Sequence, residues 1–141
     1  YINMKIIINA TDVHSGGGKV MLDDLLLASE SMNKHQFHVF IDPRYDNSDF
    51  NNSNISYYNI PKLKRVFVDN KIKKIVENDS IIINIGDLPP FKKHQCTVIQ
   101  FLMNRYFIDS FSKSGLPLMV RLRLSLAKFA FRIYLKKNTG L

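Results

Sequence analysis

The sequence predicts an α/β fold, with an open, mainly parallel sheet and helices on both of its faces. Strand-like runs alternate with helix-like segments along the 141 residues, which is the pattern of β-α-β units. Two of the strand-like runs, residues 5–9 and 80–85, are apolar at successive positions, as strands buried on both faces are. Right-handed crossovers between parallel strands then place helices on both faces.

The first half of the chain contains three expected strands and one expected helix. Residues 5–9 form a short Ile-rich strand, and residues 19–33 carry apolar side chains at helical spacing. Residues 37–42 and 55–60 have the apolar and aromatic content of strands, and a proline follows each run. Residues 43–54 are rich in Asn, Asp and Ser and are expected to form a surface loop.

The second half contains a basic helix over residues 62–78 and strands over 80–85 and 97–102. A long last helix is expected from Pro117, because proline is favoured in a first helical turn, to about residue 137. In a parallel sheet of this kind the ligand crevice lies beyond the carboxyl ends of the strands. The segments expected at that crevice are residues 9–19, 42–44, 86–90 and 100–106.

Composition and charge are those of one globular domain with a basic end. The single cysteine, Cys96, excludes an intramolecular disulfide and favours a reduced, cytosolic compartment. Residues 1–109 carry 13 Lys/Arg and 12 Asp/Glu, whereas residues 110–141 carry 7 Lys/Arg and no acid. This asymmetry predicts contact with an anionic surface. The alternative is a helix whose acidic partners lie beyond residue 141. No stretch has the roughly 18 apolar residues that a spanning helix needs.

The first candidate site is the glycine turn, Gly16–Gly18. Glycines let a ligand approach the backbone, and the helix start that follows offers free N–H groups to an anion. The turn is not a Walker motif, because Val20 stands where Ser or Thr would follow Lys19, and Met21 replaces the third glycine of the dinucleotide fingerprint. We interpret Gly16, Gly17, Gly18 and Lys19 as binding an anionic or sugar ligand. The alternative is a turn that binds nothing.

Four further residues of the expected crevice are candidates for chemistry. His14 would act as an acid or base or bind the ligand, and otherwise is solvated. Asp87 would hold a sugar hydroxyl or act as a base, or is a turn aspartate. Asn104 and Arg105 would bind a sugar hydroxyl and a phosphate, or are a cap and a surface arginine. The remaining histidines have no metal-ligand spacing: His35, His38 and His94. We therefore expect no metal and no cofactor.

The last expected helix carries its cations on one narrow stripe at about 100° per residue. The stripe comprises Arg121, Ser125, Lys128, Arg132 and Lys136. Apolar side chains cover most of the remaining surface, which is typical of an interfacial membrane helix. We therefore predict that Arg121, Lys128, Arg132 and Lys136 contact a membrane. The alternative is packing on the sheet, and both roles are compatible. Nucleic acid is not expected as a partner, because the aromatic residues of this helix look like core residues.

Taken in order, these motifs resemble a known family. The GGG turn, the IGDLPP segment after residues 80–85, the segment TVIQFLMNRYFID and the basic apolar helix resemble the N-terminal half of GT-B glycosyltransferases. The group is the glycosyltransferase family four-like enzymes that build bacterial surface polysaccharides. The resemblance implies one of two facing Rossmann-like domains, with the acceptor bound mainly here and the nucleotide-sugar by the other. It places the glycine turn at the interdomain cleft. Many relatives carry a histidine where Asn104 and Arg105 stand.

The resemblance also implies a function. Residues 1–141 would be the acceptor-side domain of an enzyme that moves a sugar from a nucleotide-sugar to a glycan or lipid-linked acceptor, at the inner face of the cell membrane. The glycine-turn amides and Arg105 would stabilise the departing phosphate, and Asp87 would contact the acceptor hydroxyl. The chain has no E-x₆-E donor segment, so we expect a fragment or split subunit that is inactive alone. The alternative is a non-catalytic binding or membrane-recruitment module that acts with a separate catalytic subunit.

Overall fold

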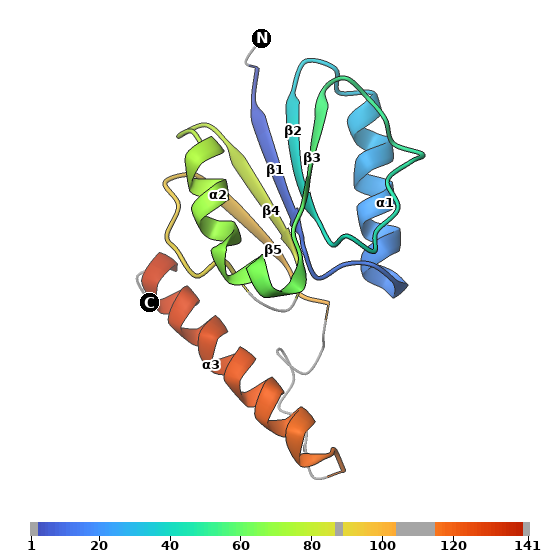
Figure 1. Cartoon of the computed structure of the whole chain (residues 1–141). Coiled ribbons are helices and arrows are strands. Elements are labelled where there is room, and N and C mark those ends of the chain that lie inside the picture. The colour runs from blue at the N-terminus through green and yellow to red at the C-terminus, as the bar shows by residue number, and fades with distance from the viewer. Residues whose placement is uncertain (1–2, 87–88, 104–114, 140–141) are drawn as a thin grey trace.

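The computed structural model describes residues 3–86, 89–103 and 115–139, and the backbone alone for 137–139. Its five strands form one sheet in which every neighbouring pair is parallel (Figure 1). They are β1 (Lys5–Ala10), β2 (Gln36–Ile41), β3 (Ile55–Asn59), β4 (Ile81–Ile85) and β5 (Thr97–Phe101). The order β3-β2-β1-β4-β5 is Rossmann-like, and its direction reverses between β1 and β4. The predicted α/β fold is confirmed.

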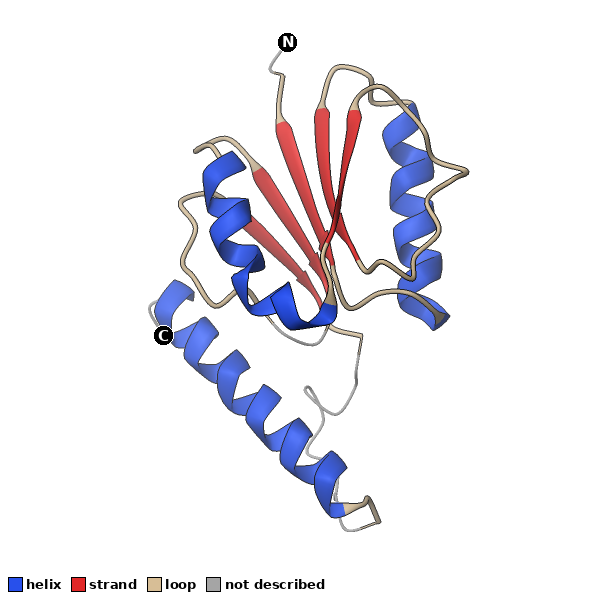
Figure 2. Ribbon diagram, viewed as in Figure 1, coloured by secondary structure: helices blue, strands red, loops and turns tan. Residues whose placement is uncertain are grey.

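Helices cover both faces of the sheet, as Figure 2 shows. Helix α1 (Gly16–Glu30) packs on one face, where Ile6 and Ile8 of β1 share a core cluster with Leu22 and Leu26. Helix α2 (Val68–Ile75) packs on the other, where Ile7 belongs to a second cluster with Ile72. The two clusters follow from the alternation of side chains along a strand. Helix α3 (Leu118–Thr139) follows β5 along the chain.

The helices expected over residues 19–33 and 62–78 have other bounds in the structure, where α1 ends at Glu30 and α2 ends at Ile75. Helix α1 begins at Gly16 rather than at residue 19, so the glycine turn is the first helical turn and not a loop. The helix expected over residues 62–78 is two elements, a 3₁₀ helix η1 (Lys62–Phe67) and α2. The geometry changes at Phe67, with φ −98° and ψ 0°, and Val76 returns to extended backbone.

Candidate functional site

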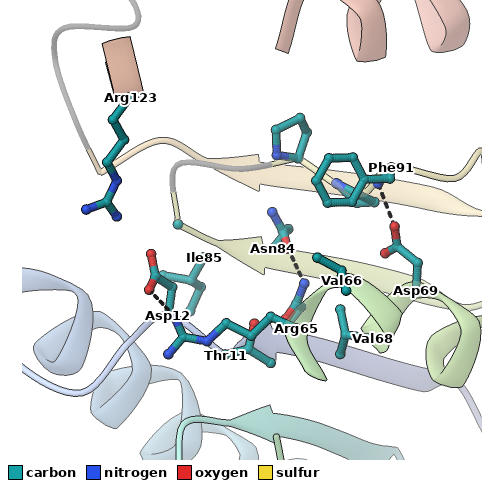
Figure 3. Close-up of a pocket in the computed structure, with 14 residues that line it drawn as sticks. Thr11, Asp12, Arg65, Val66, Val68, Asp69, Asn84, Ile85, Phe91 and Arg123 are labelled. Atoms are coloured by element: carbon teal, nitrogen blue, oxygen red, sulfur yellow. Dashed lines mark hydrogen bonds and ion pairs between the residues drawn. The ribbon is translucent and has the colours of Figure 1, made fainter. Parts of the chain in front are cut away.

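A cavity of about 180 Å³ lies at the carboxyl ends of β1 and β4, where the sheet order reverses (Figure 3). Open α/β sheets bind their ligands at this position. The lining comes from β1, β4, η1, α2, α3 and the segment before β5. It consists of Asn9, Thr11, Asp12, Arg65, Val66, Val68, Asp69, Asn84, Ile85, Gly86, Pro89, Pro90, Phe91 and Arg123.

Three amide side chains form a continuous row across the sheet beside the cavity. Asn9, Asn84 and Gln100 occupy paired positions on β1, β4 and β5, and we call them the amide row. Asn9 Nδ2 donates to Asn84 Oδ1 at 2.6 Å, and Asn84 Nδ2 donates to Gln100 Oε1 at 2.6 Å. Thr11 Oγ1 donates to Asn9 Oδ1 at 3.1 Å, and Gln100 Nε2 donates to the Gly86 carbonyl at 2.8 Å. Each amide is therefore held in one orientation.

The sequence contains a signal for part of this row, in a repeated tetrapeptide. The tetrapeptide Ile-Ile-Ile-Asn occurs twice, at residues 6–9 and 81–84. In the structure the two copies pair side by side in register, Ile6 with Ile81 through Asn9 with Asn84. A polar residue at the same place in two apolar strands indicates that both amides reach the same edge of a sheet.

A cluster of carboxylates and guanidinium groups ties β1, β2 and η1 together. Arg65 pairs with Asp12 at 2.6 Å and also with Asp42, the buried residue that follows β2. Arg44 donates to Asp42 from Nε at 2.9 Å, from Nη2 at 2.8 Å and from its backbone N–H at 2.9 Å. These bonds hold the pKa of Asp42 well below its usual range, against the opposing effect of burial. Asp12 and Asp42 therefore both form ion pairs with arginine side chains.

We expect Asp42→Asn to lower the free energy of unfolding by about 2–3 kcal/mol at pH 7 and to change its pH dependence. Because the pKa of Asp42 is depressed in the folded state, its contribution is complete above the unfolded pKa of about 4 and is lost as pH falls further. Urea unfolding of both proteins at pH 7 and pH 3 measures this. The exposed Asp24→Asn is the control. If the free energy of unfolding fell by the same amount between pH 7 and pH 3 in wild type and in Asp42→Asn, the depressed pKa of Asp42 would be contradicted.

A buried carboxylate–imidazole pair fixes the wall of the cavity that contains Phe91. Asp69 Oδ2 accepts the backbone N–H groups of Phe91 at 2.5 Å and Lys92 at 3.2 Å. Asp69 Oδ1 and both ring nitrogens of His94 have no hydrogen-bond partner among the described residues, and His94 Nε2 lies 4.0 Å from Oδ1. Burial lowers the pKa of His94, the Asp69 carboxylate opposes this, and Lys73 and Lys92 act in the same direction as burial. His94 is therefore neutral near pH 7. The sequence motifs did not single out Asp69 for this site.

The glycine turn lies next to β1 but does not line the cavity. Gly16 has φ +66°, a conformation that favours glycine. A Cβ on Gly18 would lie 3.3 Å from Val13 Cγ1, and a Cβ on Gly17 would lie 3.7 Å from Met103 Cε. Close packing therefore explains glycine at position 18 without a ligand. The N–H groups of this first turn remain available to an anion, because they have no partners within the helix.

The other residues predicted around the glycine turn also lie outside the cavity lining. Lys19 Nζ pairs with Asp23 at 2.5 Å and lies 5.7 Å from the centre of the Tyr45 ring. His14 is half-buried, and its Nδ1 has no hydrogen-bond partner in the part of the chain that the structure describes. The ligand-binding roles of His14 and Lys19 stay predictions.

The remaining predicted residues fall into two groups. The three proposed for catalysis lie outside the described residues: Asp87, Asn104 and Arg105. The four proposed for membrane contact lie on α3. Arg121, Arg132 and Lys136 are exposed, and Lys128 is half-buried.

Helix α3 has an inner face and an outer face. Leu124 is buried, and Phe131 and Tyr134 are half-buried on the same side. The opposite side carries apolar side chains that are 41–70% exposed, and we call it the outer apolar stripe. It consists of Leu118, Leu122, Leu126, Phe129 and Ile133. The cations predicted to contact a membrane lie beside this stripe rather than opposite it. Both interpretations of the helix are thus compatible with the structure.

Comparison of the chain with protein-family models, with curated proteins and with solved structures found no match. Within residues 3–86, 89–103 and 115–139, no three or more His, Cys, Asp or Glu side chains gather where they would hold a metal ion. No helix in that part of the chain has the length and apolar character needed to cross a membrane.

Proposed function

We propose that the chain is the acceptor-side domain of a sugar transferase and that the cavity holds a sugar of its substrate. The supporting observation is the lining, which combines the amides of Asn9 and Asn84, the Thr11 hydroxyl and the Asp69 carboxylate with the half-exposed ring of Phe91. Amides and carboxylates bind sugar hydroxyls with defined orientation, and an aromatic ring packs against the C–H face of a sugar. The motif resemblance favours transfer as the reaction.

In this reaction a hydroxyl of the acceptor forms a bond to the anomeric carbon of a nucleotide-sugar. The bond from that carbon to the diphosphate oxygen breaks, the nucleoside diphosphate leaves, and the hydroxyl passes its proton to a base, for which Asp87 is the candidate. The amide row and Asp69 would orient the sugar through its hydroxyl groups. The glycine turn and Arg105 are proposed to face the departing diphosphate, and Asp87 the reacting hydroxyl.

Phe91→Ala is expected to weaken monosaccharide binding about 2- to 10-fold, because it removes the aromatic ring from the cavity. Phe67→Ala is the matched control, since the two side chains are 57% and 59% exposed and only Phe91 lines the cavity. Saturation-transfer NMR with a panel of monosaccharides measures the binding. If no monosaccharide binds, or if both variants bind alike, the sugar site is wrong.

The alternative function is a non-catalytic module that recruits a separate enzyme. The coding sequence after Leu141 separates the two. A continuing frame of about 200 residues, enough for a donor-binding domain, supports the transferase. A stop codon at that position supports the module.

We also propose that α3 lies on the surface of an anionic membrane. Its outer apolar stripe would enter the interface, and the neighbouring cations would contact anionic lipid headgroups. Each cation near such a surface contributes about 1 kcal/mol. Residues 110–141 contain no acid to oppose this attraction. The proposal holds for a transferase with a lipid-linked acceptor and for a recruitment module alike, and sedimentation with vesicles tests it.

A further inference from the structure

The cavity has different chemistry at its two ends. Figure 3 shows Arg123 of α3 entering at one end, above Asp12, and Asp69 with Phe91 at the other. We infer that the cavity takes a phosphate ester of a sugar, with the phosphate at Arg123 and the sugar hydroxyls toward Asp69. The inference rests on the proposed function and names the class of substrate.

Arg123 is the cation that the cavity can offer to a ligand. Arg65, the other arginine of the lining, is already paired with Asp12 and Asp42. Arg123 makes no hydrogen bond or ion pair with a residue that the structure describes, and its side chain is exposed. A free guanidinium group matches the oxygens of a phosphate with two parallel hydrogen bonds. The nearby carboxylate of Asp12 does not oppose this, because Arg65 neutralises it.

The end of the cavity at Asp69 is suited to a neutral hydrogen-bond donor. Asp69 is 3% exposed, and its Oδ1 has no hydrogen-bond partner in the described chain. A second anion beside this carboxylate, whose Oδ1 lies 4.0 Å from His94 Nε2, would be repelled, whereas a neutral hydroxyl group would not. The cavity is also smaller than the usual 300–1,000 Å³ of a site for a drug-sized ligand, at about 180 Å³. One sugar ring with a phosphate at one end fits this size and polarity.

The phosphate ester has two possible sources. A soluble sugar phosphate would enter from solvent. A lipid-linked sugar phosphate would enter along α3, whose outer apolar stripe faces away from the body of the protein. Both present the same group to Arg123, so the recognition chemistry is shared.

Isothermal titration of the chain with glucose 1-phosphate, glucose and inorganic phosphate tests the inference. We expect glucose 1-phosphate to bind more tightly than either of the others. Arg123→Gln should weaken it about tenfold or more, through loss of the charged hydrogen bonds. Lys71→Gln is the control, since it removes an exposed cation of α2 that lies outside the cavity lining. Unchanged thermal unfolding of both variants excludes misfolding.

Four results would overturn the inference. Equal loss in the two variants would show a general charge effect, and equal affinity for phosphate and glucose 1-phosphate would show a simple anion site. If glucose binds but its phosphate binds no more tightly, the inference fails while the proposed sugar site stands. If neither glucose nor glucose 1-phosphate binds, the proposed function fails as well.

A competition experiment distinguishes the two sources. Phosphatidylcholine vesicles containing phosphatidylinositol present, on a lipid, a phosphate joined to inositol, a polyol with a six-membered ring like that of a sugar. Vesicles with the same fraction of phosphatidylglycerol are the charge-matched control. Displacement of glucose 1-phosphate by the first vesicles alone, abolished by Arg123→Gln, supports a lipid-linked ligand. Binding of glucose 1-phosphate that neither vesicle affects supports a soluble one.

Discussion

Replacing Arg121, Lys128 and Arg132 with glutamate is expected to abolish sedimentation of the protein with anionic vesicles. The three cations together supply about 3 kcal/mol of attraction to an anionic surface, or roughly 150-fold in affinity. The three new carboxylates add repulsion of comparable size. The measurement is the fraction of protein that pellets with phosphatidylcholine vesicles containing phosphatidylglycerol. Raising the salt concentration should weaken wild-type binding, because it screens exposed charges.

The matched control reverses the same amount of charge elsewhere. Lys62, Lys64 and Lys71 lie on η1 and α2 and are exposed. Their replacement with glutamate gives the same net charge but leaves α3 intact, so vesicle binding should remain close to wild type. Failure of the wild type to pellet with anionic vesicles would reject membrane contact. Similar losses in the two triple variants would show that net charge, and not α3, drives the binding.

The strands were predictable from the sequence because each is a short local pattern. Apolar runs such as residues 5–9 and 80–85 identify buried strands wherever they lie. The observed strands differ from the expected ones by one residue at one end, or at both ends for β2. The start of α1 was not predicted, because glycine disfavours a helix interior. This cost is smaller in the first turn, because the N–H groups there make no hydrogen bond within the helix, whichever residue is present.

The candidate site was only partly predictable, because its contacts join distant parts of the chain. The carboxyl ends of the strands were the expected place for a site, and the cavity lies there. Asn9 and Asn84 are 75 residues apart and meet only because β1 and β4 are neighbours. Arg65 and Asp42 likewise need the position of η1 over the sheet edge. Arg123 does not belong to the cationic stripe that periodicity predicts for α3, and nothing in the local sequence says that it reaches a cavity.

Asn84→Leu is expected to lower the free energy of unfolding by about 2–4 kcal/mol. Leucine has a similar size, so the main effect is the loss of two hydrogen bonds of the amide row. Asn9 Nδ2 then lacks its acceptor, and Gln100 Oε1 lacks its donor. Each unsatisfied buried polar group costs about 1–3 kcal/mol. Urea unfolding measures the change.

The triple replacement of Asn9, Asn84 and Gln100 with leucine shows whether the amide row serves the fold or the ligand. Removing all three amides leaves no broken pair within the row, so the triple variant should lose less stability than the sum of the three single variants. Among the hydrogen bonds of the row to other described residues, those with the Thr11 hydroxyl and the Gly86 carbonyl are then lost. Monosaccharide binding should nevertheless disappear, because the cavity loses its amides. A stable triple variant that still binds sugar would remove the row from the site, and additive loss of stability would make it part of the structural core.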